Sequence, residues 1–123
     1  MGHPSSLSAQ GPRHGKEVKI EEMVSDLSLS QKKKLLQVQE KSHERIGQLK
    51  AELDGVRDSI RTLMRRDGDN SRLLYPLFDR EGALQAQISK EMYAMRTRID
   101  AILTAEQLKE LRQAMEKRRR GKR

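Results

Sequence analysis

The feature that most constrains this chain is a long proline-free stretch in which apolar residues recur at helical spacing. The stretch runs from Leu29 to Arg66, and its apolar residues follow alternating steps of three and four from Ile46 onward. These residues are Leu35, Ile46, Leu49, Leu53, Val56, Ile60 and Leu63. The spacing places them on one stripe of an α-helix, which at about 1.5 Å per residue would be roughly 55 Å long. So long a helix needs a partner along its apolar stripe, since an isolated helix is marginally stable in water.

A polar turn and a second apolar series predict that the chain returns alongside the first helix. The turn is Arg66-Asp67-Gly68-Asp69-Asn70-Ser71, which concentrates residues that favour chain reversal. The second series consists of Leu73, Leu77, Leu84, Ile88, Met92, Met95, Ile99 and Ile102. Pro76 lacks an N–H and disfavours helical geometry at Tyr75, so we expect a secure helix only from about Pro76 to Leu103. The two arms together predict a long antiparallel helical hairpin.

A capping motif predicts a third, shorter helix. In Leu103-Thr104-Ala105-Glu106-Gln107-Leu108, the Thr104 hydroxyl can accept from the Gln107 N–H while the Gln107 side chain accepts from the Thr104 N–H. We expect this helix from Ala105 to about Lys117, followed by a solvated basic tail. The chain is thus predicted to comprise a disordered N-terminal tail (1–19), a helical domain (20–118) and a basic C-terminal tail (119–123).

Composition excludes several other classes of protein. The 123 residues carry a net charge of +8 and are 36% charged, with two Tyr, one Phe and no Trp, so a thick globular core is not expected. Glycine and proline are too sparse beyond the first fifteen residues for an all-β fold, which leaves the all-α class. No run approaches the roughly eighteen apolar residues of a membrane span. The absence of cysteine excludes thiolate sites, and no phosphate-binding loop or nucleophile elbow is present, so we do not expect an enzyme.

The starts of the first and third helices carry residues that resemble a known family. Leu103, Thr104 and Gln107 match an L-T-x-x-Q motif in full. A first copy of the motif can be placed as Leu27-Ser28-x-x-Gln31 or as Leu29-Ser30-x-x-Lys33, and the second placement keeps the hydroxyl but loses the amide. Over Glu22 to Arg118 the chain resembles the periplasmic L-T-x-x-Q proteins, which include the Spy and CpxP envelope-stress proteins and the zinc-associated ZraP.

The resemblance implies both an architecture and a function. It implies an all-α protein that forms an antiparallel, cradle-shaped homodimer in the periplasm, the signal peptide having been removed from this chain. Spy-type members are ATP-independent chaperones, without a cofactor, that hold unfolded clients on a face mixing positive charge with apolar patches. CpxP-type members damp a two-component stress pathway, which implies the periplasmic domain of a sensor kinase as an alternative partner. ZraP-type members bind zinc, which implies a metal-responsive stress protein as a further alternative.

Basic residues of the first helix are the candidate client-binding residues. They are Lys32, Lys33, Lys34, Arg45, Arg57, Arg61 and Arg65. The three lysines lie in the first turn, where the helix dipole disfavours cations, so helix stability does not explain them. Arg57, Arg61 and Arg65 stand four residues apart, with Asp54 and Asp58 close enough to pair with the first two. We interpret the row as a basic strip that attracts unfolded clients, and a merely solvated surface is the alternative.

The residues also suggest two other classes of ligand, a metal ion and a nucleic acid. His43, with Glu40 and Glu44 nearby, is the candidate metal ligand, although a helical zinc site usually has a second histidine four residues away. His3 and His14 fall in the N-terminal tail and offer a second zinc-binding hypothesis. A pI near 10.0 favours non-specific binding of nucleic acid, but the scarcity of aromatic residues argues against a specific nucleic-acid site.

Overall fold

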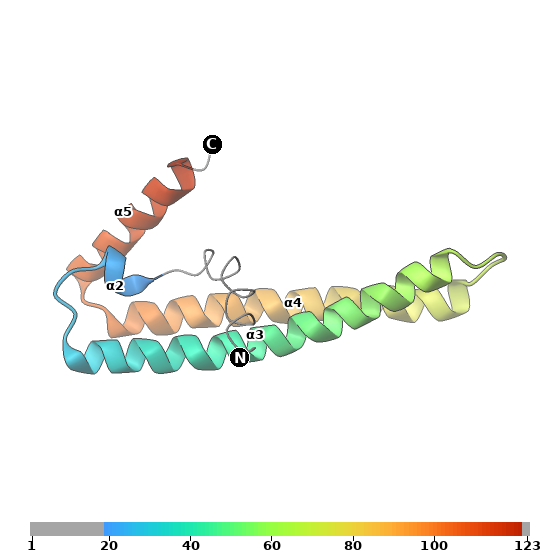
Figure 1. The fold of residues 1–123 in the computed structure, drawn as a ribbon, viewed down its shortest axis with the longest axis horizontal. Helices are drawn as coiled ribbons and strands as arrows, with labels where there is room; N and C mark the ends of the chain where they lie inside the picture. Colours follow the sequence, from blue (N-terminus) through green and yellow to red (C-terminus); the bar gives the residue numbers. More distant parts are fainter. Residues whose placement is uncertain (1–18, 122–123) are drawn as a thin grey trace, which may run out of the picture. The chain divides into compact units, whose positions relative to one another are not determined.

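The computed structural model describes residues 19–121, and within them the chain forms four helices and no strand (Figure 1). The helices are α2 (Ile20–Met23), α3 (Leu29–Met64), α4 (Ser71–Ile102) and α5 (Ala105–Gly121). The predicted all-α class is confirmed. Packing divides the chain into two compact units, Ser28–Thr104 and a second that combines Met1–Leu27 with Ala105–Arg123. We call them the hairpin unit and the terminal unit.

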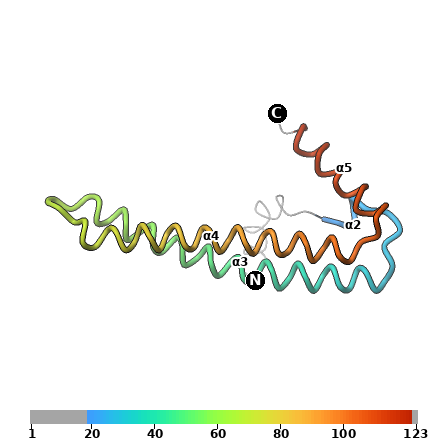
Figure 2. The backbone as a smooth tube through the Cα atoms, turned by 180° about the vertical axis from the view of Figure 1, so that it is seen from behind, coloured from blue at the N-terminus to red at the C-terminus, as the bar shows by residue number. Residues whose placement is uncertain are grey.

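The hairpin unit consists of α3 and α4 packed antiparallel along their apolar stripes. In both views the two arms run side by side and cross over toward the turn that joins them (Figures 1 and 2). The core comprises Ile46, Leu49 and Leu53 of α3 with Leu84 and Ile88 of α4, and Val56 packs against it. Steps of three and four average about 3.5 residues, a spacing that makes two helices wind around each other. The predicted hairpin is confirmed.

A serine occupies one position of this otherwise apolar seam. Ser42 lies seven residues after Leu35 and four before Ile46, and it is 2% exposed. Its Oγ has no hydrogen-bond partner within the described residues. A buried hydroxyl without a partner costs about 1–3 kcal/mol, so Ser42 weakens the seam that its apolar neighbours stabilise.

Replacing Ser42 with alanine is expected to raise the free energy of unfolding by about 1–2 kcal/mol, because the change removes an unpaired buried hydroxyl and improves helix propensity. Chemical denaturation measures the difference. Ser59→Ala is the matched control, because Ser59 lies in the same helix but is exposed. Only the propensity gain, about 0.5 kcal/mol, applies there. Equal gains in the two variants would show that burying the Ser42 hydroxyl costs nothing.

The first turn of α3 is closed by a capping box. The Ser28 Oγ accepts a hydrogen bond from the Gln31 N–H at 3.0 Å, and the Gln31 Oε1 accepts one from the Ser28 N–H at 2.9 Å. The first motif therefore falls at Leu27-Ser28-x-x-Gln31. The alternative placement on Leu29 and Ser30 is wrong, because both residues already lie inside α3, whereas an N-cap residue has non-helical geometry.

The same glutamine ties together the open end of the hairpin. The Gln31 Nε2 donates a hydrogen bond of 3.1 Å to the backbone carbonyl of Ile102, the last residue of α4. The last four carbonyls of a helix have no partner inside the helix, and this bond satisfies one of them. One side chain therefore caps the start of α3 and the end of α4.

Replacing Gln31 with alanine is expected to lower the free energy of unfolding by about 2 kcal/mol, because the cap and the bond to Ile102 each contribute about 1 kcal/mol. Urea denaturation followed by circular dichroism gives the value. Gln37→Ala is the control, since Gln37 is an exposed residue of the same helix. A loss at Gln31 no greater than the change at Gln37 would contradict the double role.

The turn between the arms is built around Gly68 and Asn70. Gly68 has φ +89°, a conformation that residues with a side chain rarely adopt. The Asn70 Nδ2 donates to the carbonyls of Leu63 at 3.3 Å and Arg66 at 3.1 Å, at the end of α3. The Asn70 carbonyl accepts from the Leu74 N–H at 2.9 Å, in the first turn of α4. Asn70 thus serves both helices, and the predicted chain reversal is confirmed.

The second arm begins earlier than predicted. α4 begins at Ser71, so the prediction that it starts only at about Pro76 is wrong. The Asp69 Oδ1 accepts from the Ser71 N–H at 3.0 Å, and the hydrogen bonds from the Ser71 N–H and hydroxyl lower the pKa of Asp69. Pro76 is the sixth residue of the helix and is exposed. Its missing N–H deprives only the carbonyl of Arg72, in the first turn, of a helical partner, so the helix tolerates it.

The last helix extends further than predicted. α5 runs to Gly121 rather than to about Lys117, so the described part of the predicted basic tail is helical. Arg119 and Arg120 each form an ion pair with Glu116, at 2.6 Å and 3.3 Å. Such pairs at three- and four-residue spacing support a helix, and cations are favourable near its C-terminal end.

The ends of the chain bear on two further expectations. Residues 1–18, which make up nearly all of the predicted disordered tail, and residues 122–123 lie outside the described residues. Lys19, the one described residue of that tail, is exposed. Within the described range no helix combines the length and the apolar composition needed to cross a membrane.

Candidate binding surface on the helical hairpin

The predicted client-binding cations point in different directions. Lys32, Lys33 and Lys34 are exposed, and the first turn of α3 contains no acidic residue. Consecutive residues lie about 100° apart around a helix, so the three lysines do not share one face. Arg45 precedes Arg57 by twelve residues, which places the two about 120° apart. The seven predicted cations therefore do not form a single basic strip.

Two arginines of the predicted row are paired with carboxylates. The Arg57 Nε donates to the Glu81 Oε2 at 2.9 Å, so this pair joins α3 to α4. Arg61 pairs with Asp58 on its own helix, as expected, whereas Arg57 reaches the opposite arm. Arg65 is exposed at the C-cap of α3. Half-exposed pairs contribute at most about 1 kcal/mol to stability, but they reduce the positive charge that the row presents.

One flank of α3 does combine cations with exposed apolar surface. Seven-residue steps return to nearly the same side of a helix, so Lys50 lies on the same side as His43 and Arg57. The flank, called the basic flank below, comprises Lys32, Leu36, His43, Lys50, Arg57 and Arg61, with the acidic residue Asp54 among them. Leu36 is 56% exposed within it. The sequence prediction omitted Lys50 and Leu36, although their spacing from Arg57 and His43 identifies both.

Large apolar residues are also exposed at the far end of the hairpin, around the turn. Met64, Leu73 and Tyr75 are more than half exposed, and Phe78 is 40% exposed. A groove there is lined by Leu63, Leu73, Pro76 and Leu77, with the polar residues Asp58, Ser59, Thr62 and Arg72 at its sides. The buried residues nearest the turn are Leu53 on α3 and Leu84 on α4. The part of the seam between them and the turn is only half covered. Exposed apolar surface of this kind is typical of protein-binding sites.

The second motif glutamine makes an analogous bond within the terminal unit. Gln107 is 6% exposed, and its Nε2 donates to the carbonyls of Ser25 at 3.2 Å and Asp26 at 3.1 Å. Thr104 directly precedes the first residue of α5, and Leu103 is buried, as their places in the motif require. Each motif glutamine therefore donates to a carbonyl two residues before the hydroxyl residue of the other motif.

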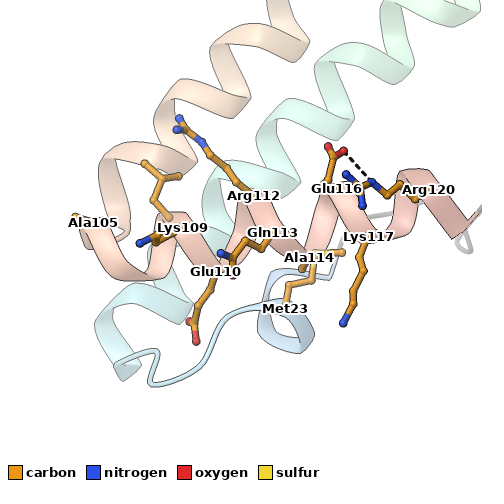
Figure 3. A pocket seen from close by; sticks show the side chains of 11 residues that line it. Met23, Ala105, Lys109, Glu110, Arg112, Gln113, Ala114, Glu116, Lys117 and Arg120 are labelled. Atoms are coloured by element: carbon orange, nitrogen blue, oxygen red, sulfur yellow. Dashed lines mark hydrogen bonds and ion pairs between the residues drawn. The ribbon is translucent and has the colours of Figure 1, made fainter.

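A groove runs along α5 in the terminal unit, lined by Met23 of α2 and by residues of α5 between Ala105 and Arg120 (Figure 3). The Glu110 Oε1 accepts from the Ser25 N–H at 3.0 Å, and its Oε2 accepts from the Ser25 hydroxyl at 2.8 Å. These two bonds lower the pKa of Glu110. The hydrogen bond and the charge of Arg119 lower the pKa of Glu116. Both carboxylates of the groove are thus held by groups of the protein.

Removing the Ser25 hydroxyl is expected to raise the pKa of Glu110 part of the way to its ordinary value of 4.5, because the backbone N–H bond remains. A carboxyl-carbon NMR titration of Ser25→Ala measures the shift. The pKa of Glu116, which depends on Arg119, is the internal control and should not move. Since the folded-state pKa of Glu110 is depressed, its stabilising effect is present above the ordinary value and is lost as pH falls through the folded-state pKa. An unchanged pKa in Ser25→Ala would contradict this contact.

The structure does not assemble a metal site around the predicted histidine. Among residues 19–121 no group of three or more His, Asp or Glu side chains is placed to hold a metal ion. His43 is exposed on the basic flank. His3 and His14 lie outside the described residues.

No protein-family model, curated protein or solved structure matches this chain. The resemblance to the L-T-x-x-Q proteins therefore stays a prediction. Its two motifs nevertheless both fall directly before helices, at Ser28 before α3 and at Thr104 before α5.

Proposed function

We propose that this chain is an ATP-independent chaperone of the Spy and CpxP type, which holds unfolded clients in the periplasm and acts as a homodimer. Its mechanism is binding and release, without a chemical step. The observation that carries the proposal is Leu36, which is 56% exposed among the cations of the basic flank instead of being buried in the seam. A surface of this kind attracts an unfolded chain by charge and retains it by apolar contact.

The two components of the basic flank have separate roles in this mechanism. The cations of the basic flank steer acidic segments toward α3 over distances of about one Debye length, roughly 8 Å at physiological salt. Leu36 then contacts apolar side chains that the client has not yet buried. One exposed leucine buries little area, so the client leaves and folds without the help of a nucleotide. Raising the salt concentration should therefore slow capture more than it changes release.

The proposal is tested by suppression of aggregation of a chemically denatured, unrelated protein at stoichiometric ratios without nucleotide. We expect Lys50→Glu to slow capture roughly threefold at low salt, because it reverses a charge on the basic flank. We expect Leu36→Gln to leave the capture rate near that of the unaltered chain and to speed release, because it removes apolar contact. Stopped-flow fluorescence of a labelled client separates the two rates.

Lys41→Glu is the matched control for the charge reversal. Lys41 is an exposed lysine of the same helix and lies nine residues before Lys50, which places it about 180° around the axis. The overall change in net charge is then the same, but the basic flank is intact. Equal slowing by both variants would show that net charge alone attracts clients and would remove the flank from the proposal.

Zinc distinguishes the proposed function from its alternatives. The assay is repeated with zinc and with a chelator, on the unaltered chain and on His43→Ala. Suppression that is the same in both conditions supports the chaperone. Suppression that requires zinc would contradict it in favour of a metal-responsive stress protein. Absence of suppression in both conditions would contradict it in favour of a regulator of a sensor kinase.

A further inference from the structure

A second row of exposed residues lies on α4, on the side opposite the core. Tyr75 and Tyr93 are each 65% exposed and lie eighteen residues apart, which is about five helical turns, so both project from the same side. The row, called the outer row below, consists of Tyr75, Asp79, Gly82, Ala86, Lys90 and Tyr93, all of them exposed. Leu84 and Ile88, which are buried against α3, lie on the other side of the helix. Within the described part of the chain, α4 therefore has one side in the seam and one side that is exposed.

The outer row can pair with the same row of a second copy that runs in the opposite direction. Tyr75 and Tyr93 stand nine residues on either side of position 84, and Gly82 and Ala86 stand two residues on either side. Asp79 stands five residues before that position and Lys90 six residues after it. If two copies of α4 packed antiparallel about position 84, tyrosine would meet tyrosine and small residue would meet small residue. Each Asp79 would meet the opposite charge of the other copy's Lys90.

Among residues 19–121 the charges of the outer row have no partner. Asp79 and Lys90 take part in no ion pair of the described residues. A Cβ added at Gly82 would meet nothing within 4 Å, so this side of the helix is open. Small residues at a helix crossing allow the two axes to approach to about 8 Å. At that separation the tyrosines at both ends can bury their rings against the facing helix.

We propose that the outer row of α4 is a homodimer interface, in which two copies pack antiparallel about a two-fold axis near position 84. Charge complementarity selects a second copy as the occupant, because one row supplies both signs at positions that the two-fold axis brings to within one residue of each other. The assignment rests on the proposed function only in requiring a homodimer. It uses no residue of the basic flank of α3, so dimer formation and client capture can be measured separately.

The chain contains no cysteine, so disulfide trapping tests the geometry directly. Chains carrying Gly82→Cys and Ala86→Cys are mixed under mild oxidation. We expect the mixed disulfide to exceed either symmetric disulfide by about tenfold, because antiparallel packing brings position 82 of one copy within disulfide reach of position 86 of the other. Gly47→Cys with Ala51→Cys is the matched control, with the same residue types and spacing on an exposed side of α3. It should give little product and no preference for the mixed species.

Charge reversal tests the complementarity itself. Asp79→Lys and Lys90→Asp are each expected to raise the dissociation constant of the dimer about tenfold at low salt, because each turns two attractions per dimer into two repulsions. Combining both changes in one chain exchanges the signs and should restore the constant to within about twofold. Sedimentation equilibrium measures the constants, and circular dichroism checks that each variant is helical. A double variant that is as weak as the single variants would overturn the pairing.

The outcomes separate this interface from the proposed function. A chain that remains monomeric overturns both the interface and the homodimer of the proposed function, whereas trapping through positions 47 and 51 instead of 82 and 86 overturns the interface alone. In either case the aggregation assay decides whether the chain holds clients. Trapping through 82 and 86 in a chain that does not suppress aggregation supports the interface and overturns the proposed function. Gly82→Leu is a variant in which misfolding would not explain a loss of the dimer, because leucine improves helix propensity and the side chain enters open space. It should weaken the dimer at least tenfold while the monomer becomes no less stable.

Discussion

Contact between two apolar stripes stabilises everything else in the hairpin unit. Ile46, Leu49 and Leu53 on α3 are removed from solvent because Leu84 and Ile88 lie opposite them, and either stripe alone would face water. Two helices can cover only the sides that face each other. Every other side remains exposed, including the basic flank of α3 and the outer row of α4. The thin core and the large surface left for binding therefore have one cause.

Polar contacts at the helix ends set where each arm starts and stops. Gln31 uses its amide oxygen for the N-terminal cap of α3 and its amide nitrogen for the last carbonyl of α4. A glutamate at this position could supply the oxygen but not the nitrogen, because an ionised carboxylate only accepts hydrogen bonds. Gln107 donates to Ser25 and Asp26 in the same manner. The chemistry of the amide thus explains why the motif ends in glutamine rather than in another good helix former.

Periodicity and capping chemistry were enough to predict the three longer helices, the turn and the apolar part of the seam, because these are properties of neighbouring residues. The short helix α2 was not predicted. Contacts between the arms were not predictable in the same way. The partner of Arg57 is Glu81, which lies on the other helix, and nothing in the local pattern identifies it. Ser42 is polar, so the apolar pattern did not identify it, although it is buried in the seam. The penalty that Pro76 imposes is real, but a single lost hydrogen bond near an exposed helix end is outweighed by the fixed start at Ser71. For the site, the sequence prediction chose cations by residue type, whereas the seven-residue spacing of His43, Lys50 and Arg57 is what places them on one side of α3.

The hydrogen bonds of Asn70 also decide between two ways in which the arms could pair. Its amide reaches the end of α3 only when the chain reverses at this point. A continuous helix from α3 into α4 would forfeit both bonds and would hold Gly68 in helical geometry, at a further cost of about 1 kcal/mol. Exchange of arms, with α3 of one copy packed on α4 of another, requires that extended form. The bonds of Asn70 and the geometry of Gly68 therefore favour a chain that closes on itself over one that exchanges arms with a second copy.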